Sequence, residues 1–179
     1  MKQLILLIAL IGLGSISNAQ TDTLHLTNAL VVSHMDNQED RYSLEVAISE
    51  MLSANKVKNA VSLNVLKQGG DPQVLMTDSL TQILAAKGIN TMMLVSIRGY
   101  DKRFHRSEKK LTLAEDLSAA NLFSLYKDDI VSVTLEFHFY RNGVLVGSDL
   151  LKIGAISSRE GVMKKLRKKL PKRIRKHWK

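Results

Sequence analysis

Titratable side chains follow two apolar runs that the sequence predicts to be parallel strands. His34 and Asp36 follow residues 29–33, and Arg98 and Asp101 follow the run that ends at residue 97. Because the carboxyl ends of parallel strands meet at one edge of a sheet, where α/β proteins bind ligands, these four residues form a possible ligand edge. Such a set could bind a small ligand or a metal ion or support hydrolysis, and solvated loop residues are the preferred interpretation.

A second candidate is His138, which lies beside Glu136 and Tyr140 on one face of an alternating segment. It could be a ligand or an acid-base group, or it could simply meet water or a helix. The sequence has no Ser-His-Asp pattern, no phosphate-binding loop and no metal-spaced histidine pair. Its lack of cysteine excludes disulfides, a thiolate nucleophile and cysteine-based zinc sites. We therefore predict a protein that is not an enzyme and needs no cofactor.

The carboxyl-terminal segment has the most distinctive composition. Residues 159–179 hold 11 Lys and Arg against the single acid Glu160, whereas residues 20–158 have a net charge of −2. Apolar residues recur at helical spacing between Val162 and Ile174, which predicts an amphipathic helix that is kinked or restarted at Pro171. The residues expected to bind an anionic surface are Lys164, Lys165, Arg167, Lys168, Lys169, Lys172, Arg173, Arg175, Lys176 and Trp178.

Phospholipid head groups, lipopolysaccharide phosphates and an acidic envelope protein are all candidates for that surface. Alternatively the apolar stripe packs on the sheet and the lysines are only solvated. Both hold if residues 162–170 pack and the end is free. Deletion of residues 171–179 is expected to leave folding intact and to weaken binding to anionic liposomes at low salt. Nucleic acid is not expected as a natural partner because the chain is predicted to be exported. The sequence leaves the oligomeric state open.

The first nineteen residues predict an export signal. A short basic start is followed by ten apolar residues at 4–13, too few for a membrane-spanning helix, and then by small residues at 17 and 19. Cleavage before Gln20 would release a periplasmic or secreted protein. Without a cysteine the chain has no lipidation site at this position.

The remaining pattern predicts an α/β fold, a sandwich of two or three layers with a βαβαβ core, an antiparallel hairpin and a basic carboxyl-terminal helix. One domain at 20–158 precedes the basic segment 159–179. The expected elements are strand 29–33, helix 40–55, strand 61–66, helix 74–87, strand 91–97, a surface loop at 98–106, a helix or irregular segment at 113–126, and strands 131–140 and 144–153 around an Asn142-Gly143 turn.

This order of elements resembles a group of cell-envelope proteins. They are the outer-membrane activators of penicillin-binding proteins, the periplasmic domain of the curli secretion channel and the amino-terminal domain of the Tol-system propeller protein. The resemblance covers residues 29–156 and implies a non-enzymatic module that binds other envelope proteins. Many members of the first two groups are lipoproteins, and this chain lacks the cysteine that anchors them.

Together these features predict a non-enzymatic periplasmic binding or accessory module that docks through its basic end. The alternative is a small-ligand-binding protein or weak hydrolase that uses the carboxyl edge of the sheet. A deep pocket lined by His34 and Arg98 would favour the alternative, and a shallow edge with an exposed strand would favour the binding module.

Overall fold

A computed structural model describes residues 24–66, 70–106, 109–119 and 123–179. The signal peptide predicted at residues 1–19 lies outside them. The strands are β1 (Asn28–Ser33), β2 (Lys58–Val61), β3 (Thr91–Tyr100), β4 (Ser132–Arg141) and β5 (Val144–Gly154). The helices are α1 (Gln38–Ala54), α2 (Asp78–Ala86), α3 (Leu113–Ser118) and α4 (Arg159–Arg173), with 3-10 turns η1 (Ser62–Asn64) and η2 (Pro72–Met76) and a π-helical turn η3 (Ile174–Trp178).

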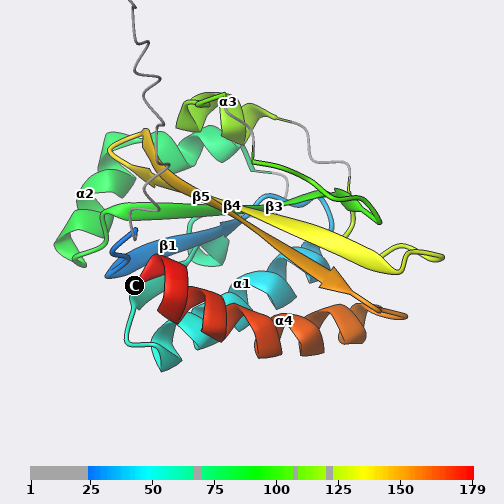
Figure 1. Cartoon of the computed structure of the whole chain (residues 1–179). Coiled ribbons are helices and arrows are strands. Elements are labelled where there is room, and N and C mark those ends of the chain that lie inside the picture. The colour runs from blue at the N-terminus through cyan, green and yellow to red at the C-terminus, as the bar shows by residue number, and fades with distance from the viewer. Residues whose placement is uncertain (1–23, 67–69, 107–108, 120–122) are drawn as a thin grey trace, which may run out of the picture.

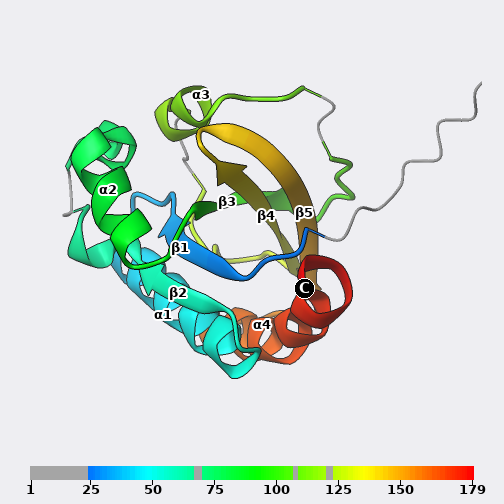
Figure 2. The same ribbon diagram turned by 90° about the vertical axis from the view of Figure 1, so that its left-hand side faces the viewer.

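The five strands form one mixed sheet in the order β2-β1-β3-β4-β5 (Figure 1). β1 pairs in parallel with β2 and β3, and β4 pairs antiparallel with β3 and β5. Helices α1 and α4 cover one face, and α2, η2 and α3 lie on the other (Figure 2). The predicted α/β fold is therefore confirmed, in its three-layer form. Among the described residues, no helix has the length and apolar character to cross a membrane.

The β4–β5 hairpin forms as the sequence predicts, with positive φ angles at Asn142 and Gly143. The structure differs in that β4 is buried on both faces. Phe137 and Phe139 face α1 and α4, while Glu136 and Tyr140 on the opposite face are also buried. The reason is that β4 is a central strand, and the layer that contains α3 covers its polar face.

The strand predicted at 61–66 is wrong, because β2 ends at Val61 and the chain turns into η1. The fully buried carboxylate of Glu45 explains the turn. It accepts hydrogen bonds from the Ser62 hydroxyl at 2.7 Å and from the Leu63 backbone at 3.2 Å. A buried carboxylate must be hydrogen bonded, and an extended chain at residue 62 would withdraw these donors.

The loop predicted at 98–106 begins too early, because β3 continues to Tyr100 through a bulge between Ile97 and Gly99. Gly99 has a φ of +153°, and the Phe104 ring lies where a side chain would project. A Cβ at position 99 would approach Phe104 Cζ to 2.5 Å. The extension carries Arg98 along the sheet and keeps it beside β4.

Pro171 does not interrupt α4, which continues to Arg173 and then into η3. Every fourth residue of this segment is buried, and this buried row comprises Val162, Leu166, Leu170, Ile174 and Trp178. The expectation of a free end is therefore wrong. The last apolar positions, Ile174 and Trp178, belong to the same core as the first.

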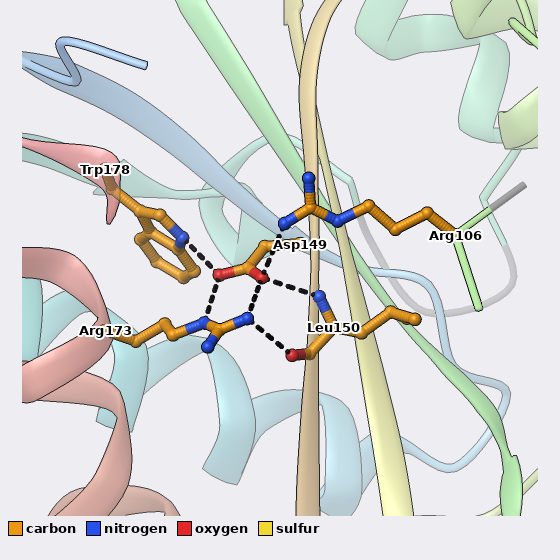
Figure 3. Close-up of polar contacts among 5 residues, drawn as sticks. All are labelled: Arg106, Asp149, Leu150, Arg173 and Trp178. Carbon is orange, nitrogen blue, oxygen red and sulfur yellow. Dashed lines mark hydrogen bonds and ion pairs between the residues drawn. The ribbon is translucent and has the colours of Figure 1, made fainter. Parts of the chain in front are cut away.

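The end of the chain is held by Asp149, a residue of β5 that is only 2% exposed (Figure 3). Arg173 binds both of its carboxylate oxygens, at 2.7 and 2.6 Å, and the Trp178 indole N–H donates to it at 2.7 Å. Arg106 adds a contact at 3.2 Å. Burial by itself raises the pKa of Asp149, but these hydrogen bonds and positive charges outweigh it and lower the pKa overall.

Trp178 also packs against two rings of β4. Its centroid lies 4.9 Å from that of Phe137 and 5.0 Å from that of Phe139. Its backbone carbonyl accepts a hydrogen bond from Leu26 N at 2.6 Å, so the two ends of the described chain meet here. Trp178 therefore contributes ring packing, a buried hydrogen bond and a backbone contact.

We expect Trp178→Ala to lower the free energy of unfolding by about 3–5 kcal/mol, because it leaves a cavity and removes a donor from buried Asp149. Urea unfolding followed by circular dichroism measures the change. Lys176→Ala is the matched control, since Lys176 is exposed two residues away and should stay within about 0.5 kcal/mol of the wild type. A loss below about 1 kcal/mol for Trp178→Ala would contradict a packed chain end.

Candidate functional site

A cavity of about 260 Å³ lies at the carboxyl end of β3, on the sheet face that α3 covers. It brings together two of the four predicted edge residues, His34 and Arg98. The polar side chains that line it are His34, Ser96, Arg98, Lys109, Asp116, Glu136 and His138, and the apolar ones include Leu111, Ala119 and Phe123. The predicted edge therefore contains a cavity, and its use as a ligand site stays a prediction.

The other two edge residues lie elsewhere. Asp36 lines a neighbouring cavity of about 660 Å³, which His34 also borders. Asp101 accepts hydrogen bonds from Val131 N at 3.0 Å and Ser132 N at 2.7 Å, and thereby holds the start of β4 against the end of β3. Asp101 is a structural residue, while Asp36 and His34 share a cavity wall.

His138 lies between two carboxylates. Its Nδ1 is 2.5 Å from Asp116 Oδ2, and its Nε2 is 3.4 Å from Glu136 Oε1. The Tyr140 hydroxyl donates to the same Asp116 oxygen at 2.7 Å. Asp116 comes from α3, which begins with a capping box formed by Thr112 and Glu115. Asp116 is not among the residues predicted from the sequence, although a Thr-x-x-Glu pattern directly before it marks the start of a helix.

This arrangement makes His138 an imidazolium at neutral pH. Burial alone lowers its pKa, but the hydrogen bonds and charges of Asp116 and Glu136 raise the pKa to about 9. Burial alone would raise the pKa of Asp116, and the bonds from His138 and Tyr140 lower it overall. Because both ring nitrogens point at carboxylates, His138 has no lone pair with which to act as a general base.

His34 and Arg98 are less fully engaged. Burial is the main cause that lowers the pKa of His34, so its ring is neutral at pH 7, and it makes no hydrogen bond to the described residues. Arg98 has a side chain that is 42% exposed, and among the described residues its one polar side-chain contact is a long one, 3.8 Å to Glu136. These two groups are therefore able to donate hydrogen bonds to a ligand.

The basic helix α4 forms a second candidate surface, and its cations divide into three rows. A strand-facing row of Lys165, Lys169 and Arg173 donates to carbonyls along the edge strand β5. Lys165 reaches Gly154 O at 2.8 Å and Lys169 reaches Lys152 O at 2.8 Å. Four helical residues and two strand residues both advance roughly 6–7 Å, so the two repeats match. This row occupies carbonyls that an edge strand would otherwise expose.

A second row faces α1. Arg159 contacts Glu39 and Asp40, each at 2.6 Å, and Arg167 contacts Glu50 at 3.4 Å. Arg175 reaches the Asn55 side chain at 3.4 Å. These arginines join the two helices of one layer, so their charges are partly satisfied within the protein.

The third row faces solvent. This lysine row consists of Lys164, Lys168, Lys172 and Lys176, which are all exposed and form no hydrogen bond or ion pair with the described residues. Each lies two residues from a member of the buried row, which is about 200° around a helix and thus on the opposite face. Of the ten residues expected to bind an anionic surface, these four have no partner in the part of the chain that the structure describes. Arg173 and Trp178 point inward to Asp149 instead, because a buried carboxylate needs donors.

Comparisons with known proteins show similarity only to solved structures. No protein-family model and no curated protein matches the chain. The PelC dodecamer from Paraburkholderia phytofirmans is 9% identical, covering 81% of this chain and 88% of that one, with a TM-score of 0.39. Lipoprotein GNA1162 from Neisseria meningitidis is 16% identical, covering 83% of this chain and 98% of that one, with a TM-score of 0.41. At these values neither likeness bears on function, and the resemblance to the three envelope groups stays a prediction.

The described residues contain no group of three or more His, Cys, Asp or Glu side chains placed to hold a metal ion. The histidines, carboxylates and guanidinium that line the cavity can bind and orient a polar ligand.

The charged cluster predicts a pH dependence of stability. The pKa of His138 is about 9 in the folded protein and about 6.5 when unfolded, so its contribution is complete below pH 6.5 and is lost as the pH rises to 9. We expect the difference in unfolding free energy between the wild type and His138→Gln to be largest at pH 6 and to shrink towards pH 9.5. Urea unfolding at several pH values measures this difference.

His105→Gln serves as the control, since His105 is exposed on the loop after β3. Its difference from the wild type should stay small at every pH. If the His138→Gln difference were independent of pH between 6 and 9.5, His138 would not be held as an imidazolium by Asp116 and Glu136.

Proposed function

We propose that the mature protein is a non-enzymatic binding module of the cell envelope that docks on an anionic membrane surface through the lysine row of α4. The observation that carries this proposal is the position of the row. Four lysines, one on each successive turn, lie opposite the buried row and have no partner among the described residues. Cations that stabilise nothing inside the protein are available to a surface outside it.

The residue type favours a lipid surface over a single acidic protein site. Arginine binds carboxylates and phosphates in a fixed bidentate geometry, whereas lysine is a hydrated point charge on a flexible chain. In α4 the arginines face Asp149 and α1, and the solvent-facing row is entirely lysine. A flexible row suits a diffuse layer of anionic head groups, where each lysine contributes about 1 kcal/mol.

The mode of docking would be peripheral. Trp178, the aromatic residue of this segment, is 1% exposed and so is not available to enter the head-group region. Binding then depends on charge alone and weakens as salt screens it. An export signal at residues 1–19, if it is removed before Gln20, would put this surface outside the cytoplasm, where anionic lipid and lipopolysaccharide phosphates are present.

A non-enzymatic role is supported by the state of His138. Both of its ring nitrogens are engaged by carboxylates, and a protonated histidine cannot accept a proton from a substrate or water. The polar side chains that line the cavity are suited to holding a ligand.

We expect the fourfold variant Lys164→Gln, Lys168→Gln, Lys172→Gln and Lys176→Gln to bind vesicles with 30% phosphatidylglycerol about 100- to 1000-fold more weakly than the wild type. Vesicle co-sedimentation at 50 and 300 mM salt measures binding, which should fall with salt for the wild type. The matched control replaces four exposed lysines elsewhere, Lys58, Lys87, Lys110 and Lys127, with Gln and has the same net charge.

The proposal fails if the control loses as much binding as the lysine-row variant, because net charge alone would then explain the affinity. It also fails if the wild type does not bind anionic vesicles but binds an acidic envelope protein through the same lysines. That second result would make the partner a protein.

A further inference from the structure

The cavity under α3 has hydrogen-bonding donors and acceptors that the described residues do not fill. The geometry points to a binding site for a small zwitterion that carries an ammonium and a carboxylate, such as a free α-amino acid. This inference concerns a different surface from the lysine row, on the opposite face of the sheet, and does not depend on it.

The unfilled acceptors are carboxylate oxygens on Glu136 and Asp116. Glu136 has a side chain that is only 7% exposed, yet its contacts are long, 3.4 Å to His138 and 3.8 Å to Arg98. Asp116 receives hydrogen bonds from His138 and Tyr140 on Oδ2, and its Oδ1 has no donor among the described residues. Buried carboxylates normally accept several short hydrogen bonds, so both can take a further donor. An ammonium supplies three donors from one atom.

The unfilled donors lie at the same cavity wall. Arg98 has five N–H groups and one long contact, and the His34 ring has no hydrogen bond to the described residues. A guanidinium fork matches the two oxygens of a carboxylate, and the neutral imidazole can donate a further bond. Arg98 Nη1 lies 3.8 Å from Glu136 Oε2, so a ligand bound to both must carry its two charges close together, as an α-amino acid does.

The charges of the whole cavity favour a zwitterion over a simple ion. Asp116 and Glu136 lie next to the imidazolium of His138 and the guanidinium of Arg98, so acids and cations nearly balance at this wall. A free carboxylate would meet two acids, and a simple amine would meet two cations. The volume of about 260 Å³ suits a molecule of amino-acid size, and Leu111 and Phe123 offer contact to its apolar part.

The first test uses the wild-type protein and ligands that differ by one charge. Isothermal titration calorimetry at pH 7 with glycine, L-alanine and L-leucine should show binding of at least one of them. The amide of the tightest binder lacks the carboxylate and its N-acetyl derivative lacks the ammonium, and each should bind about tenfold or more weakly. No binding of any of the three amino acids, or equal binding of the N-acetyl derivative, would overturn the inference.

The second test locates the site. Arg98→Gln and Glu136→Gln should each weaken amino-acid binding about tenfold or more, since each removes one charge-assisted bond. The controls are Arg103→Gln and Glu50→Gln, because both residues are exposed and neither lines the cavity. Circular dichroism confirms that each variant is folded. Equal losses in the controls, or none in Arg98→Gln and Glu136→Gln, would place binding elsewhere.

The fourfold lysine-row variant separates this inference from the proposed docking. It should keep the full amino-acid affinity of the wild type while losing its affinity for vesicles. Conversely, Arg98→Gln should bind anionic vesicles as the wild type does, because Arg98 lies on the other side of the sheet from α4. The amino-acid site and the vesicle-binding surface are therefore tested separately, and a negative result for one does not contradict the other.

Discussion

The buried carboxylate of Asp149 is the constraint on which the carboxyl-terminal layer depends. A carboxylate that is 2% exposed costs several kcal/mol unless it is paired and hydrogen bonded. Its donors come mainly from Arg173 and Trp178, so the last residues of the chain must return to β5. This requirement explains why a segment with 11 basic residues in 21 is part of the folded core.

Asp149 also fixes the rotation of α4 about its axis. That rotation determines what each face of the helix contacts. With Arg173 and Trp178 held against β5, the strand-facing lysines meet backbone carbonyls and the arginines on the next face meet α1. The lysine row lies on the face of α4 that contacts neither β5 nor α1. Its exposure is a geometric consequence of satisfying one buried acid, since residues two positions apart lie on opposite sides of a helix.

On the opposite face of the sheet, buried carboxylates also need hydrogen-bond donors, but here the protein satisfies them only in part. Asp116 and Glu136 share His138, and the pairing satisfies the imidazolium while leaving carboxylate oxygens with unfilled capacity. The sequence indicated that His34 and Arg98 would meet, because they follow neighbouring parallel strands. It could not indicate Asp116, since the contact between a six-residue helix and β4 depends on how the intervening chain folds over the sheet. Asp101 shows the reverse case, a polar loop residue that serves only to join β3 to β4.

Local patterns determined the α/β class, most of the strands, the Asn142-Gly143 turn and the amphipathic character of α4, because side-chain periodicity and turn chemistry act over a few residues. Tertiary structure decided the points that depend on burial. Hydrogen bonds to the buried Glu45 end β2 at Val61. The layer that contains α3 buries the polar face of β4, and Asp149 binds the indole of Trp178 near the chain end. A charge in a sequence looks the same whether it will be solvated or buried. Only the packed structure determines which charges need a partner and which lysines are left for another molecule.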